Sequence, residues 1–239
     1  MISQEEINLN IETLRSTSAI TKAFYYYNYQ RSIAPNTPPC SERYEILKLL
    51  VKSEKLDLKQ VVSRGNDMLK NLSVCFGIVI EQESLDKSFL GKLIEAGFNL
   101  NDLNPELGSP YFHELVSVIG WQPSEKAFNI LSELLARKKI DINQGDKDGT
   151  TVLMKAIISG KLELCKFLIS QEGINLNIEN SYGKSAITKA FYYDEYTKNC
   201  GKPYNNNCYE IIKLLIESEK FDFNQVFSDG TNTLIFAYS

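Results

Sequence analysis

The sequence predicts an all-α fold, a solenoid in which short helix–turn–helix units stack side by side. Two observations support this. Part of the chain occurs twice, and a four-residue apolar–polar alternation recurs after apolar runs that have helical spacing. One such unit cannot bury its own apolar face, whereas stacked neighbours bury their faces together. We therefore expect a single array over residues 1–239.

The duplication lies in two blocks. Residues 2–26 and 169–193 are identical at 19 of 25 positions with a constant offset of 167, and residues 44–61 match residues 209–226 at 12 of 18 positions. Chance does not produce identity at this level over such lengths. We infer that part of the chain arose by a recent duplication.

Two unlike segments separate the duplicated blocks, Tyr27–Arg43 in the first copy and Asp194–Cys208 in the second. Together they are rich in Pro, Asn and Ser, which favour turns and loops. We expect each segment to be a long surface loop inserted between the two helices of a unit. Unlike loops on like scaffolds suggest selection on the identity of the loops.

A shorter period lies inside the duplication. Apolar–polar tetrads occur at 7–10, 56–59, 98–101, 140–143, 174–177 and 221–224. Each follows an apolar run; in Glu210–Ile216, for example, Ile211, Leu214 and Leu215 share one helical face. After several tetrads comes a glycine that suits a tight turn, at Gly65, Gly108, Gly149, Gly183 and Gly230. A second apolar helix follows, as in residues 150–160 and 184–193.

These signals divide the chain into units. The predicted full units are residues 11–59, 60–101, 102–143, 144–177 and 178–224, with partial units at 1–10 and 225–239. Because both ends fall inside a unit, we expect the chain to be a segment of a larger protein.

With its residues laid out, the stretch DKDGTTVLMKAIISGKLELCKFLISQEGINLN (146–177) resembles an ankyrin repeat. The residues at the consensus positions of that family are Gly149, Thr151, Leu153, Ala156, Gly160, Glu163, Leu168 and Asn177. The other units are degenerate versions of it. The resemblance implies an ankyrin-like solenoid that binds a partner protein through its turn tips and inner helices.

Composition narrows the class of partner. The net charge of −4 gives no overall basic field for nucleic acid. The amino terminus does not look like a secretory signal, and no run approaches the roughly 18 apolar residues of a membrane span. Five scattered cysteines do not form a disulfide framework. We expect a monomer in a reducing, cytoplasmic compartment.

Catalytic and metal sites find no support in the sequence. His113 is the single histidine, and the family resemblance implies that its ring bonds the backbone of a neighbouring turn. We expect Cys75 and Cys165 to pack in helices, and the remaining cysteines, Cys40, Cys200 and Cys208, to be surface thiols. There is no phosphate-binding glycine loop. We therefore expect no enzyme activity, no cofactor and no metal.

Clusters of tyrosines are a stronger sequence signal for a functional site than the histidine or the cysteines. They gather at the end of one predicted inner helix and again in its copy, as Tyr25, Tyr26, Tyr27 and Tyr29, and as Tyr192, Tyr193 and Tyr196. Such rings either cover the helix ends and anchor the inserted loops or contact a partner, since tyrosine is enriched at interfaces. The resemblance adds exposed groups at a turn tip and on inner helices, namely Tyr182, Lys155 and Lys189.

The predicted function is therefore a protein-interaction scaffold. The bias to Asn, Ile and Lys suggests an AT-rich organism, and ankyrin proteins that intracellular bacteria secrete into host cytoplasm are similar to this chain. The alternative is a regulatory or substrate-recruiting arm of an enzyme whose catalytic domain lies outside this segment. The full-length reading frame distinguishes the two.

Overall fold

The computed structural model describes residues 49, 88–105, 107–121, 123–199, 206–228, 230 and 232. Within these ranges the secondary structure consists of helices and isolated bridges, without a strand, so the all-α prediction is confirmed. Contacts divide the chain into two compact units, residues 1–100 with 104–106 and residues 101–103 with 107–239. The finer division into the units predicted above, as a single array, stays a prediction.

In the first compact unit the described helix is α6, Phe89–Glu95. It begins at the cap residue Ser88, whose hydroxyl accepts a hydrogen bond from the Gly91 amide at 3.0 Å. It is closed at Gly97, which has a φ of 105° and an amide that donates to the Ile94 carbonyl at 3.0 Å. Leu93 and Phe98 are buried beside this turn.

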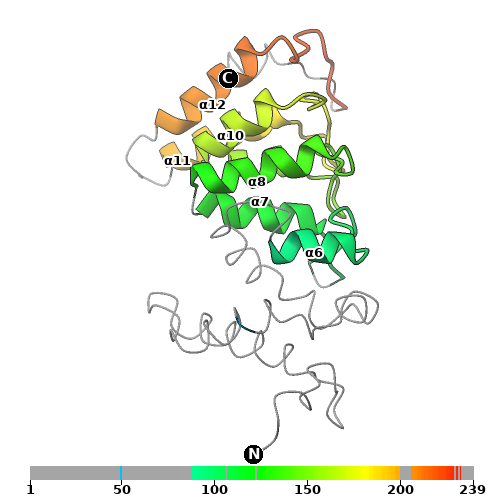
Figure 1. Cartoon of the computed structure of the whole chain (residues 1–239). Coiled ribbons are helices and arrows are strands. Elements are labelled where there is room, and N and C mark those ends of the chain that lie inside the picture. The colour runs from blue at the N-terminus through cyan, green and yellow to red at the C-terminus, as the bar shows by residue number, and fades with distance from the viewer. Residues whose placement is uncertain are drawn as a thin grey trace, which may run out of the picture. The chain divides into compact units, whose positions relative to one another are not determined.

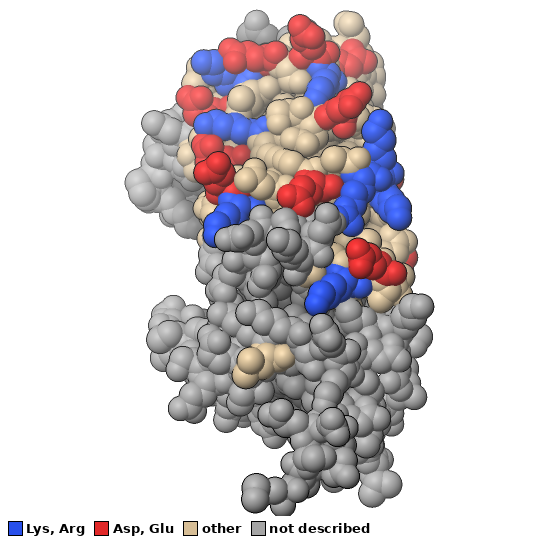
Figure 2. Space-filling view, in the orientation of Figure 1, with Lys and Arg blue, Asp and Glu red and all other residues tan. Residues whose placement is uncertain are grey.

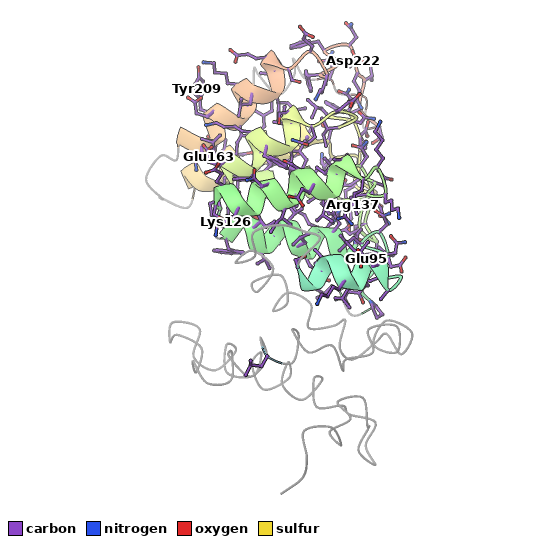
Figure 3. The ribbon with its side chains drawn as sticks, in the orientation of Figure 1. Glu95, Lys126, Arg137, Glu163, Tyr209 and Asp222 are labelled. Atoms are coloured by element: carbon purple, nitrogen blue, oxygen red, sulfur yellow. The ribbon has the colours of Figure 1, made fainter. Side chains whose placement is uncertain are left out.

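In the second compact unit the helices form three consecutive pairs (Figure 1). The inner helices are α7 (Tyr111–Trp121), α9 (Val152–Ile158) and α11 (Ala186–Asn199), and their outer partners are α8 (Glu125–Ala136), α10 (Leu162–Ser170) and α12 (Asn206–Glu217). Helix α9 packs between α7 and α11, and α10 packs against α12. Figure 3 shows that Lys126, Glu163 and Tyr209, early in each outer helix, lie on one side, so the outer helices run in the same direction.

Apolar spacing explains why these helices stack. In α8 the buried residues are Ala127, Ile130, Leu131 and Leu134, which share one face because they fall at i, i+3, i+4 and i+7. The Phe128 ring meets the Phe167 ring of α10, with centroids 5.1 Å apart. Burial of such faces supplies most of the stability of short helices in water.

Asparagines that close the tetrads tie each unit to the next. The Asn143 carbonyl oxygen Oδ1 accepts from the Asn175 amide at 2.8 Å, and its Nδ2 donates to the Gly173 carbonyl at 2.8 Å. Asn101 makes the same two bonds to Asp141 and Lys139, and Asn177 makes them to Asp222 and Lys220. We call these three side chains the asparagine rungs. Each one satisfies two backbone groups that would otherwise be left to solvent.

A local turn inside the tetrad precedes the rungs Asn143 and Asn177 and recurs at Asn224. The second tetrad residue accepts a hydrogen bond from the amide two positions ahead: Asp141 from Asn143 at 2.9 Å, and Asn175 from Asn177 at 2.9 Å. Asp222 does the same for Asn224 at 2.8 Å. Asp and Asn favour such turns because their short side chains reach this amide.

The predicted loop at Asp194–Cys208 is wrong for the residues that the structure describes. Residues 194–199 continue α11, which runs for 14 residues where α9 runs for 7, and residues 206–208 begin α12. Asp194–Asn199 contains neither glycine nor proline, and the breakers Gly201 and Pro203 come only later. The insertion therefore lengthens a helix. The other predicted loop, Tyr27–Arg43, lies outside the described residues.

Replacing Asn143 tests the strength of a rung. In Asn143→Ala both hydrogen bonds are lost, and we expect the free energy of unfolding to fall by about 1–2 kcal/mol, since one such bond is worth roughly 0.5–1.5 kcal/mol. The measurement is urea unfolding followed by the fluorescence of Trp121, the single tryptophan. The control is Asn129→Ala on the exposed face of α8. Equal urea midpoints for the two variants would contradict the role of the rung.

Lys138 adopts a left-handed conformation that glycine adopts more easily. Its φ is 53°, two residues beyond the end of α8, where Gly97 stands beyond α6. In Lys138→Gly we expect a gain of about 1 kcal/mol in the free energy of unfolding, because a side chain costs about that much in this region. Circular dichroism during urea unfolding measures it. Lys213→Gly, inside α12, should lose about 1 kcal/mol; a loss at Lys138 as well would refute the interpretation.

Candidate functional site

Turn tips precede each inner helix, at residues 103–110, 145–151 and 179–185. The first two are closed by antiparallel bridges, Leu103 with Pro110 and Gly145 with Thr151. In the second tip, Asp146 Oδ1 accepts from the amides of Asp148 and Thr150, both at 3.0 Å. These bonds hold the turn in one conformation.

The third tip repeats this arrangement with an amide in place of the carboxylate. Asn180 Oδ1 accepts from the amides of Tyr182 and Lys184 at 3.0 Å, and the buried Asn180 donates through Nδ2 to Thr150 Oγ1 at 3.2 Å. Tyr182 at the apex keeps a 67% exposed side chain. The turn is therefore rigid while its apex side chain faces solvent.

Neighbouring tips are joined through their backbones. The Lys147 amide donates to the Gly108 carbonyl at 2.8 Å, and the Ser181 amide donates to the Asp148 carbonyl at 2.9 Å. Beyond the third tip, the Ser228 amide donates to Glu179 Oε2 at 3.0 Å. The tips thus form a continuous row with fixed spacing.

Two sets of corresponding positions on the inner helices form two further rows beside the tips. Glu114, Lys155 and Lys189 lie four residues after Pro110, Thr151 and Ser185; Ser117, Ile158 and Tyr192 lie seven residues after them. The last three are exposed, whereas Lys155 and Lys189 are half-buried. We call these two rows the inner-helix face.

Lys155 is fixed by an ion pair with Asp146, with Nζ 2.9 Å from Oδ2. Burial would raise the pKa of Asp146, but the Lys155 ammonium and the amides of Thr150 and Asp148 outweigh it and hold that pKa below its usual 3.8. The bond links a turn tip to its inner helix. Lys155 therefore has a structural role in addition to the binding role predicted for it.

The predicted tyrosines separate into two groups. Tyr192 is 45% exposed, and the Lys184 ammonium donates to its hydroxyl at 3.3 Å and lies 5.0 Å from its ring centroid. Tyr193 is half-buried against Gly160, where an added Cβ would lie 2.6 Å from the tyrosine hydroxyl. The Tyr192 ring is partly exposed to solvent, whereas the Tyr193 hydroxyl packs against the turn between α9 and α10.

Some predicted tyrosines lie outside the description. Tyr25, Tyr26, Tyr27 and Tyr29 fall outside the described residues, and for Tyr196 only the backbone, in α11, is described. Their contacts with a partner stay predictions.

Sequence reasoning missed Trp121, the last residue of α7. Its side chain is 73% exposed, and the Lys161 ammonium lies 3.8 Å from its ring centroid. Both residues line a small hollow between α7 and α9. An apolar helical pattern gives a terminal tryptophan the appearance of a core residue; that it is the single tryptophan of the chain was the available signal.

His113 confirms its predicted structural role. It is buried, and its Nε2 lies 3.0 Å from the Gln144 carbonyl in the next turn, so Nε2 carries the proton and donates it. Burial and, secondarily, the positive Lys155 lower the pKa of His113 from 6.5 to about 4, against the opposing effects of the Gln144 carbonyl and Asp146. The ring is therefore neutral at pH 7.

The cysteines give one confirmation and one correction. Cys165 is buried in α10 as predicted, and burial raises its pKa to about 12. Cys208, predicted as a surface thiol, is buried too, because it shares a face of α12 with Ile211 and Leu215 at i+3 and i+7. Cys40, Cys75 and Cys200 lie outside the described residues.

Among the described residues, His, Cys, Asp and Glu side chains form no cluster of three that could hold a metal ion. In the same part of the chain, no helix combines the length and the apolar character needed to cross a membrane.

Figure 2 shows the outer-helix face, where positive and negative side chains alternate over α8, α10 and α12. Such a mixed face is typical of a surface that stays in water.

Residues 123–200 match the family model described as ankyrin repeats (3 copies). Among curated proteins, no sequence matches the chain significantly.

Several solved structures resemble the chain. EF0377, described as an ankyrin repeat protein, has a TM-score of 0.56 at 19% identity, covering 91% of each chain. The ankyrin repeat domain of Bcl-3, a member of the IkappaB protein family, has a TM-score of 0.57 at 18% identity, covering 98% of this chain and 83% of that one. An ankyrin repeat domain (ABAYE2397) from Acinetobacter baumannii AYE has a TM-score of 0.53 at 21% identity, covering 88% and 91%. Likeness at these identities shows a shared fold.

The depressed pKa of His113 predicts a loss of stability in acid. The unfolded chain takes up a proton near pH 6.5 and the folded chain only near pH 4, so this contribution is complete above pH 6.5 and is lost as the pH falls toward 4. The free energy of unfolding should decrease by up to about 1.4 kcal/mol per pH unit in this window.

His113→Met isolates the effect, since Met154 holds the corresponding position in α9 and the chain has no other histidine. The free energy of unfolding, measured with urea at pH 7.0, 6.0, 5.0 and 4.5, should fall less steeply with decreasing pH in the variant than in the parent chain. Parallel curves would show that His113 does not carry the linkage.

Proposed function

We propose that this chain, whose residues 123–200 match the ankyrin-repeat family model, binds a partner protein through its turn tips and inner-helix face. Ankyrin repeats generally mediate protein–protein interaction, and their fold is typically a non-catalytic module. The all-α ankyrin solenoid predicted from the sequence is confirmed.

One observation supports this assignment most directly. The tips form a hydrogen-bonded row whose apex side chain at Tyr182 is 67% exposed, although the backbone beneath it is fixed by Asn180. A surface that is already ordered loses little conformational entropy when it binds. Tyrosine adds contact area and a polar hydroxyl with few rotatable bonds.

Further side chains extend the same surface. Tyr192 and Ile158 are 45% and 44% exposed on the inner helices, and Lys189 lies between the tips and Tyr192. Lys155 contributes through the portion of its side chain that its ion pair leaves exposed, 34%. Tyr193 would contribute the part of its ring that packing against Gly160 leaves exposed. Contacts of the partner with Tyr196, Tyr25, Tyr26, Tyr27 and Tyr29 are proposed from the sequence alone.

The setting of this binding is also part of the proposal. The bias to Asn, Ile and Lys fits an AT-rich genome. We extend the proposal to a bacterial protein that acts as a monomer in the cytoplasm of a host cell; the composition bears only on the source. When the chain is expressed in cultured animal cells as a fusion with a fluorescent protein, microscopy should show fluorescence in the cytoplasm. Accumulation at membranes or in the nucleus would contradict this location.

A matched pair of variants tests the binding surface. Peptides are selected from a phage-displayed random library on the immobilised chain, and the affinity of the tightest is measured by calorimetry. Tyr182→Ser should weaken binding by about tenfold, as loss of a central aromatic contact costs about 1–2 kcal/mol.

The control is Tyr209→Ser, because Tyr209 is also exposed, at 57%, but lies on the outer helix α12 (Figure 3). This variant should bind as the parent chain does. Peptides that respond to Tyr209→Ser and not to Tyr182→Ser would place binding on the outer helices and refute the proposal.

A further inference from the structure

The hollow between α7 and α9 combines an aromatic ring with two ammonium groups. Trp121 and Lys161 line it together with Lys155, and Ser117 and Ser159 add hydroxyl groups. Its apolar lining comes from side chains such as Val116 and Ala156. The hollow belongs to the inner-helix side of the solenoid, next to the exposed Ser117 and Ile158.

The charge of this hollow is positive. Among the described residues of its lining, the two lysines are the ionic side chains, and no carboxylate occurs there. Lys155 is paired with Asp146 from the neighbouring turn tip, whereas Lys161 rests on the Trp121 ring and has no ion-pair partner in the part of the chain that the structure describes. His113, which also lines the hollow, adds no charge at neutral pH because burial keeps it unprotonated.

The Lys161 ammonium above the Trp121 ring still has N–H groups that can donate hydrogen bonds. An ammonium over an aromatic face gains roughly 0.5–1 kcal/mol at an exposed site, and a carboxylate can accept hydrogen bonds from its remaining N–H groups. The ring is 73% exposed and offers apolar contact area beside that donor. A single exposed tryptophan at the edge of a hollow has the composition of a binding hot spot.

We propose that this hollow binds an acidic side chain of the partner protein, with the carboxylate on Lys161 and an adjacent apolar residue of the partner against Trp121. This inference rests on the proposed function and names the chemistry of the partner: a segment in which Asp or Glu stands next to a large apolar residue. Complementary charge selects such a segment and disfavours a basic one.

A second aromatic–lysine pair lies on the same face of the solenoid. Lys184 lies 5.0 Å from the Tyr192 ring centroid and bonds its hydroxyl. The two pairs come from different helix pairs, α7 with the start of α10 and the third tip with α11. A partner segment with acidic–apolar pairs at two places could therefore engage both.

The selection described above tests the chemistry directly. Library peptides that bind the chain should be enriched in Asp and Glu next to Leu, Phe or Trp. Binding of the leading peptide is followed by the fluorescence of Trp121, which reports on this hollow because it is the single tryptophan. Replacing the acid of that peptide by Gln or Asn should weaken binding about tenfold.

Variants of Lys161 supply the matched comparison. Lys161→Met keeps the aliphatic stem and removes the charge, and it should weaken the acidic peptide about fivefold; Lys161→Arg keeps both charge and stacking and should bind as the parent chain does. Lys166→Met removes an exposed lysine from the outer helix α10, where Lys166 pairs with Glu163, and should change nothing. Circular dichroism verifies that each variant is folded.

The outcomes separate this inference from the proposed function. Peptides that depend on Tyr182 but show neither acidic enrichment nor dependence on Lys161 would overturn the acidic-partner inference and leave the proposed binding surface intact. Peptides that ignore Tyr182 as well would overturn both. A selection that yields no binder at all also counts against both.

Discussion

The register of the stack depends on the three asparagine rungs, each of which closes a tetrad in the described part of the chain. Apolar faces alone would let neighbouring helix pairs slide, because burial is non-directional. The side chain of Asn143 fixes the register by bonding one backbone N–H and one carbonyl of the next unit, at Asn175 and Gly173. The same geometry recurs at Asn101 and Asn177. Backbone groups that lack a strand partner are thereby satisfied, and every tip is placed at a set distance from the next.

The proposed binding surface follows from this register. Because the rungs and the tip-to-tip bonds hold the turns in place, Tyr182 and the inner-helix residues project from a backbone that is ordered before any partner arrives. The two sides of the helix pairs differ in chemistry as a result. The outer helices carry interspersed charges (Figure 2), whereas the inner side has a tryptophan and two lysines around a hollow between α7 and α9, and an exposed tyrosine, Tyr192, on α11. Aromatic rings with adjacent cations suit recognition, and mixed charges suit solvent.

Much of the fold could be predicted from local pattern. Apolar spacing located helices such as α9, α11 and α12, and the family resemblance gave His113 its bond to a neighbouring turn. The failures came where two local signals competed. Asparagine-rich composition suggested a loop over Asp194–Cys208, but no helix breaker occurs before Gly201, so α11 continues and Cys208 joins the buried face of α12. The hollow beside Trp121 could not be predicted, because Lys161 reaches that ring only after α7 and the start of α10 are brought together.

The rungs also bear on how such a chain can change over time. Each rung bonds main-chain atoms of the neighbouring unit. These bonds therefore do not depend on which side chains that unit carries at its tip or along its helices. A unit can then be copied and set beside a different unit without redesign of the joint. The near-identical blocks at 2–26 and 169–193 are what such interchangeable parts would leave behind.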